Sequence, residues 1–138
     1  MSSPVHLSQQ QLDVMDVLWS HGAATASDVH AALEPELGLA PTTVATVLQR
    51  LAKRGVLTAE RQGRAYVYVP AVSRERVRRS MTGRLMDQLF GGRPAALVSH
   101  LLREEELGAD DLAELQRLLR KARASEDASD HPDADDHV

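Results

Sequence analysis

The chain has 138 residues, which suits one compact domain with an appendage, and its net charge of −4 taken alone argues weakly against nucleic-acid binding. It contains no cysteine, which excludes disulfide frameworks, cysteine-ligated zinc, and catalytic or redox thiols. No apolar run approaches the roughly 20 residues needed to cross a membrane, and no signal-peptide pattern begins the chain, so we expect a cytoplasmic protein.

Three helices are predicted in the first part of the chain. The first begins at Ser8, where Gln11 completes a capping-box pattern, and the second begins at Thr25 or Ser27. The third begins at Pro41, a residue that suits the first helical turn because it lacks a backbone N–H. Its apolar residues recur with helical spacing in one stripe, which consists of Val44, Val47, Leu48 and Leu51.

The period of the pattern changes after Gly55. Residues 56–61 and 64–69 are predicted to form two strands around a turn at Gln62-Gly63, and Pro70 closes the second strand. Three helices followed by a β-hairpin are typical of a winged helix-turn-helix. We therefore expect a domain of this kind over residues 1–72.

From Ser73 the pattern is helical again, in three amphipathic segments. They have too little apolar bulk for a core of their own, so we expect a second copy of the chain to cover their apolar faces. This predicts a dimerisation region over residues 73–124, with contacts from Val77, Met81, Leu85, Leu89, Leu97, Leu101, Leu112, Leu115 and Leu119. Residues 125–138 are acidic and are expected to be disordered. The predicted fold is mostly α-helical with a small β-hairpin wing.

The charges are unevenly distributed along the chain. Residues 1–40 contain five acids and no Lys or Arg, whereas residues 41–80 contain nine Lys or Arg and two acids, a local charge of +7. Residues 83–138 have a net charge of −6. A basic block between acidic ones is what a localised contact with nucleic-acid phosphates predicts.

The third predicted helix has the side chains that a helix in the major groove of DNA needs. Thr42, Thr43 and Thr46 lie at its start, and a threonine can donate a hydrogen bond, accept one, or contact a thymine methyl. Cations lie where phosphates would run, further along this helix and beside the hairpin turn. They are Arg50, Lys53, Arg54, Arg61 and Arg64. The alternative, for the threonines and for the cations, is that they belong to an ordinary solvated surface without a binding role.

Three stretches are specific enough to compare with known families. They are LDVMDVLW at 12–19, PTTVATVLQRLAKRG at 41–55 and GRAYVYVP at 63–70. Together they resemble the penicillinase repressor family (BlaI/MecI, with CopY as its copper-responsive branch), from about Leu7 to Arg123. The resemblance implies a winged helix that binds an inverted-repeat operator in double-stranded DNA, and C-terminal helices that form a homodimer. It also implies that Tyr66 joins the cations at the DNA backbone.

The resemblance further implies a way to relieve repression. Penicillinase repressors are cleaved in the C-terminal region by a membrane-bound sensor with a metalloprotease domain. The matching pair here is His100-Leu101, where the family has Asn-Phe. The copper-responsive branch binds metal through cysteine pairs, which this chain lacks.

Other functions are weighed by the side chains that they require. We expect no enzyme, because no nucleophile with a base, paired carboxylates or phosphate-cradling glycine loop is recognisable, and we expect no cofactor or resident metal. One alternative is a ligand- or metal-responsive winged-helix regulator, whose metal ligands would be His131, Asp133, Asp135, Asp136 and His137. Another is a winged helix that binds only protein, which steeply salt-dependent duplex binding would exclude.

Overall fold

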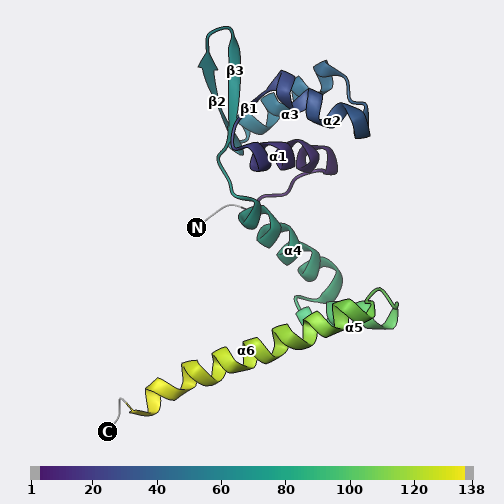
Figure 1. Cartoon of the computed structure of the whole chain (residues 1–138), viewed down its shortest axis with the longest axis vertical. Coiled ribbons are helices and arrows are strands. Elements are labelled where there is room, and N and C mark those ends of the chain that lie inside the picture. The colour runs from purple at the N-terminus through teal and green to yellow at the C-terminus, as the bar shows by residue number, and fades with distance from the viewer. Residues whose placement is uncertain (1–3, 136–138) are drawn as a thin grey trace. The chain divides into compact units, whose positions relative to one another are not determined.

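The computed structural model describes residues 4–135 (Figure 1), with side chains up to residue 128. The chain divides into two compact units at Gln88/Leu89. The first unit contains α1 (Gln9–His21), β1 (Ala24–Thr25), α2 (Ala26–Leu37), α3 (Pro41–Lys53), β2 (Leu57–Gln62), β3 (Ala65–Pro70) and most of α4 (Arg74–Phe90). The second contains α5 (Pro94–Arg103) and α6 (Ala109–Asp135). The mostly helical fold with a winged helix-turn-helix and a hairpin wing is as predicted.

The first two helices begin at reciprocal side-chain caps. The Ser8 hydroxyl accepts from the Gln11 N–H at 3.2 Å, and the Gln11 side chain accepts from the Ser8 N–H at 3.0 Å. Thr25 and Asp28 form the same arrangement at α2, so Thr25 is the cap. A hydrogen bond from the Thr25 backbone, and to a smaller extent one with the Thr25 side chain, hold the pKa of the Asp28 carboxyl below its ordinary value.

The sheet has three antiparallel strands in the order β1-β3-β2. The two-residue strand β1 was not predicted, because it is too short to show an alternating pattern. At the other end of the hairpin, Gln62 pairs with Ala65, and the turn consists of Gly63 and Arg64, one residue later than expected. Gly63 has φ +63°, a conformation that glycine adopts without strain.

The core of the first unit is mostly aliphatic, includes Tyr68, and joins every element of that unit. The apolar stripe of α3 is buried in it, as predicted, together with residues from the N-terminal segment, α1, α2, the hairpin and α4. Trp19 lies at its edge, where the indole N–H donates to the Val72 carbonyl at 2.9 Å. The orientation of α3, and with it the direction of its exposed face, is therefore fixed by packing along the whole length of the helix.

Replacing Leu48 by Ala tests how much this packing stabilises the unit. Leu48 is 0% exposed, and a buried leucine truncated to alanine typically costs about 2–5 kcal/mol of unfolding free energy. We expect a loss in this range by urea denaturation at fixed protein concentration. The exposed neighbour Gln49→Ala should change stability by no more than about 0.5 kcal/mol. Equal effects of the two variants would contradict the burial of this stripe.

The start of α4 belongs to the first unit, which corrects part of the predicted interface. Val77 is 2% exposed in the core, so it is not available for the dimer contact predicted for it. Met81 packs against the same core and is only partly buried, so its dimer contact stays a prediction. The compact unit accordingly ends at Gln88 and not at residue 72. The tertiary contacts explain this difference, because the Trp19 bond to the residue 72 carbonyl and an Arg74–Asp16 ion pair of 3.8 Å direct α4 onto α1.

The second unit consists of two helices joined by a short loop. No side chain in its described part is buried, and its apolar residues line the α5–α6 contact or face solvent. The helix α6 continues to Asp135 and so includes much of the acidic tail, whose disorder stays a prediction. No glycine or proline occurs from Ala109 to His131, and helix propagation is favourable once a helix has begun. Residues 136–138 lie outside the described part of the chain. None of the helices within residues 4–135 is both long and apolar enough to span a bilayer.

Candidate nucleic-acid interface

The exposed face of α3 gathers the three predicted threonines at its first turns. Thr42 and Thr46 are exposed and Thr43 is half-buried, on the side of the helix away from the core stripe. The Thr46 hydroxyl donates to the Thr42 carbonyl at 2.9 Å. Its hydrogen is therefore used within the helix, which leaves an acceptor oxygen and a methyl group for an external partner.

Two predicted cations follow in the last turn of α3. Arg50 and Lys53 are both exposed, and α3 contains no acidic residue. Within the described residues, neither cation has a hydrogen bond or an ion pair. Their full positive charge is therefore available to an anion that approaches this face of the helix.

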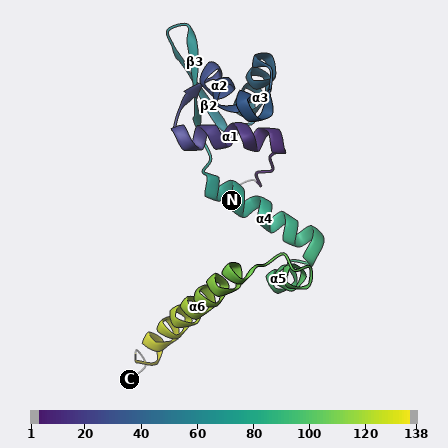
Figure 2. The same ribbon diagram turned by 45° about the vertical axis from the view of Figure 1, so that its right-hand side comes forward.

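The hairpin of β2 and β3 carries the remaining predicted contacts and projects from the helices of the first unit (Figure 2). Arg61 stands opposite Tyr66 in the strand register, and Tyr66 is 50% exposed. The Arg61 Nε–H donates to the Gly63 carbonyl at 3.2 Å, which holds this side chain over the turn. Arg64, in the turn itself, is exposed and has no partner among the described residues.

Arg54 differs from the other predicted cations. Its guanidinium donates to the His6 carbonyl at 2.9 Å and to the Gln11 side chain at 3.3 Å. The predicted contact with DNA phosphates is therefore not supported for Arg54, because the group is already held by the segment before α1. No local pattern signals this, since the partners are 48 and 43 residues away in sequence.

The structure also places two unpredicted side chains beside the threonines. A cavity of about 410 Å³ lies between the starts of α2 and α3 and is lined by Ser27 and His30 on one side and Thr42 on the other. The His30 imidazole lies 3.6 Å from the Glu34 carboxylate, one turn later on α2. Only the folded chain brings these two helix starts together, so no sequence pattern could have indicated the pair.

The remaining residues predicted for dimerisation differ in exposure. Leu85, Leu89, Leu112 and Leu119 are exposed, with Leu89 70% exposed. Leu97, Leu101 and Leu115 are half-buried, and the last two line the contact of α5 with α6. His100 of the predicted cleavage pair is exposed, and its ring lies 5.8 Å from that of Phe90.

The predicted metal alternative falls mostly outside what the structure describes. No group of three or more metal-binding side chains occurs among the residues whose side chains are placed. The histidines and aspartates at 131–137 lie beyond those side chains.

Comparison with known proteins gives consistent results. The sequence model of a family described as "Penicillinase repressor" matches residues 7–121. The transcriptional regulator BlaI of Mycobacterium tuberculosis is 38% identical over 130 residues, covering 90% of this chain and 90% of that protein. The penicillinase repressor of Bacillus licheniformis is 26% identical over 115 residues, covering 83% of this chain and 90% of that protein. The solved structure of Bacillus licheniformis BlaI in monomeric form with the blaP half-operator is 32% identical, with a TM-score of 0.48, over 54% of this chain and 92% of that one.

Proposed function

The chain belongs to the penicillinase repressor family, and on this premise we propose that it binds an inverted-repeat operator in double-stranded DNA as a homodimer. It is a DNA-binding transcriptional repressor and not an enzyme. The observation that carries the finer proposal is the exposed face of α3. The first turns of this face carry short side chains that can form hydrogen bonds, and its last turn carries unpaired cations. The opposite side of the helix is the buried apolar stripe.

In this proposal α3 lies in the major groove and the hairpin lies along the neighbouring backbone. The helix has 13 residues, a length of about 20 Å, and the groove of about 12 Å admits one helix. Threonine side chains are short, so the first turns of α3 must approach the base edges closely. The base contacts come from Thr42, Thr43 and Thr46, and the backbone contacts from Arg50, Lys53, Arg61, Arg64 and Tyr66.

The proposed dimer forms through the second unit and the end of α4. Exposed leucines in a unit without any buried side chain in its described part support a second copy as their partner. Leu85, Leu89, Leu112 and Leu119 are the most available of the predicted contacts, joined by the half-buried Leu97, Leu101 and Leu115. A dimer presents two copies of α3, which matches the two halves of an inverted repeat.

The proposed release of the operator follows from the same unit. Cutting the chain at His100-Leu101 separates α6 from most of α5 and so removes much of the apolar surface that two copies share. A membrane sensor-protease is the proposed agent. The pair lies inside α5, and we expect cleavage to require local unfolding of this short helix, which has no buried residue.

Thr46→Ala tests the base contacts. In this assay the operator is represented by a DNA duplex that the full chain selects from a random-sequence pool. Because the Thr46 hydroxyl hydrogen is used within α3, the loss concerns its oxygen and methyl, and we expect a cost of about 1–2 kcal/mol on the selected duplex. Binding to a random duplex should be nearly unchanged, as measured by fluorescence anisotropy.

Thr46→Val separates the two remaining groups. It keeps a methyl and removes the oxygen, so a contact with a thymine methyl predicts near wild-type affinity for Val and weak binding for Ala. Thr58→Ala on the hairpin is the control, because the Thr58 hydroxyl donates to the Val69 carbonyl of the neighbouring strand at 3.5 Å. If Thr46→Ala binds both duplexes like the wild type, base recognition lies elsewhere.

A further inference from the structure

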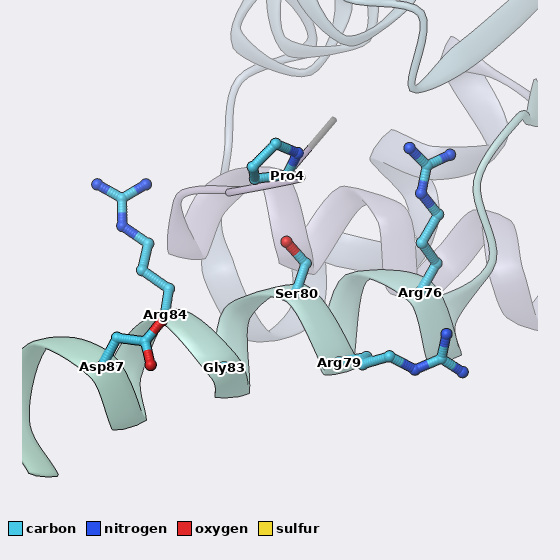
Figure 3. A pocket seen from close by; sticks show the side chains of 7 residues that line it. All are labelled: Pro4, Arg76, Arg79, Ser80, Gly83, Arg84 and Asp87. Carbon is cyan, nitrogen blue, oxygen red and sulfur yellow. The ribbon is translucent and has the colours of Figure 1, made fainter. Parts of the chain in front are cut away.

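The segment before α1 is a structural part of the first unit. We call residues 4–8 the N-terminal strap. Val5 and Leu7 are buried in the core, and the Val5 N–H donates to the Ser80 hydroxyl of α4 at 2.8 Å. Figure 3 shows Pro4 above Ser80, at a groove of about 600 Å³ along α4. One end of the strap is thereby fixed to a helix 75 residues away in sequence.

The other end of the strap is fixed to α3. Arg54 is the C-terminal cap residue of α3, and its N–H bonds to the Arg50 carbonyl at 3.0 Å. Its guanidinium reaches the His6 carbonyl and the Gln11 side chain, whose oxygen already accepts from the Ser8 N–H. The same side-chain oxygen therefore belongs to the cap of α1 and to the end of α3.

We propose that Arg54 is a positioning residue for DNA binding, which acts by tying the end of α3 through the strap to α1 and α4 and not by touching phosphate. The inference rests on the proposed function only in that DNA binding is the measured property. A helix of 13 residues is about 20 Å long, so a tilt of about 5° moves its far end by about 2 Å. Such a shift is enough to break hydrogen bonds made by short threonine side chains at the first turn.

The guanidinium suits this connection because it donates to two acceptors in a fixed geometry. A lysine has one nitrogen on a flexible stem, and it keeps the charge without reproducing the pair of bonds. The exchange of Arg54 for Lys therefore separates the two roles. A phosphate contact would largely survive it, whereas a positioning role would be lost.

The experiment uses the full chain and a duplex that the wild type selects from a random-sequence pool, with affinities measured over a range of KCl concentrations. We expect Arg54→Ala and Arg54→Lys to weaken binding to that duplex roughly tenfold, the size of one or two lost hydrogen bonds. The loss on a random duplex should be smaller, and the dependence of log Kd on log salt should keep its slope. The matched control is Arg50→Ala, one turn earlier, which should make the slope shallower by about 2 for a dimer.

Ser80→Ala tests the opposite end of the strap with no change in charge. It removes the acceptor of the Val5 N–H, and we expect weaker binding to the selected duplex with an unchanged salt slope. Thr82→Ala is its control, an exposed hydroxyl on the same helix without a partner among the described residues. Circular dichroism at the assay temperature must show every variant folded. Faster amide exchange at Val5 and Gln11 in Arg54→Ala reports the loosened strap directly.

The proposal is overturned if Arg54→Ala makes the salt slope shallower by about 2 and Arg54→Lys binds like the wild type. It is also overturned if Arg54→Ala leaves amide exchange at Val5 and Gln11 unchanged. A failure of the proposed function looks different, because Arg50→Ala and Arg64→Ala would then leave the slope unchanged. The exchange of the Val5 and Gln11 amides would still decide the role of Arg54.

Discussion

A chain that ends at Gln88 is expected to be a folded monomer that binds its operator about 10²–10⁴-fold more weakly than the full chain. The first unit keeps every buried hydrophobic residue of the described chain, from Val5 to Val77, so the shortened chain retains its core. It loses α5 and α6 with their exposed leucines. Without the second copy, each half of an inverted repeat is bound independently, and the gain from joining two binding events disappears.

Sedimentation equilibrium and anisotropy titrations measure these two effects. A chain ending at Pro70 is unsuitable, because it also removes Val72 and Val77 from the core. The full-length control is Leu112→Asp with Leu119→Asp, two side chains on α6 that are 40% and 59% exposed. Charges at these positions should prevent dimerisation with little effect on a single chain. If the chain ending at Gln88 dimerises as strongly as the full chain, the interface lies in the first unit.

Raising the salt concentration from 50 to 200 mM is expected to weaken operator binding about 10³–10⁴-fold. In the proposed complex, about eight phosphates are contacted by four cations from each of two subunits, namely Arg50, Lys53, Arg61 and Arg64. The expected slope of log K against log salt is then on the order of −7. The Arg61 side chain is held over the turn by its bond to the Gly63 carbonyl. If the two copies of Arg61 do not reach phosphate, the expected slope is about −5.

Arg64→Ala should make this slope shallower by about 2 and weaken all duplexes alike, since it removes one proposed phosphate contact from each of two subunits. Its matched control is Arg117→Ala, an exposed arginine on α6 in the second unit, which should leave the slope unchanged. An affinity that does not change with salt would contradict the assignment of these cations to phosphates.

The local features of this fold could be predicted from the sequence because they depend on neighbouring residues. Caps act over three residues, as at Ser8 and Gln11, and a helix stripe such as that of Leu48 and Leu51 acts over one or two turns. The hairpin is indicated by the aromatic and β-branched residues 66–69 and by a glycine at its turn. The exposed face of α3 follows directly, because fixing the buried stripe fixes the opposite side of the helix.

Features that depend on contacts between distant segments could not be predicted from the sequence. An amphipathic pattern shows that Val77 is covered, but it does not show which residues cover it. The path of residues 71–73 places Val77 in the core of its own chain. A local charge count treats Arg50 and Arg54 alike, although they differ entirely in their surroundings. The Arg54 guanidinium meets a carbonyl 48 residues away, and the Arg50 guanidinium meets no described group. Local patterns show which side chains face outward, and the folded chain shows which of these have no partner, because partners come from segments that no local pattern encodes.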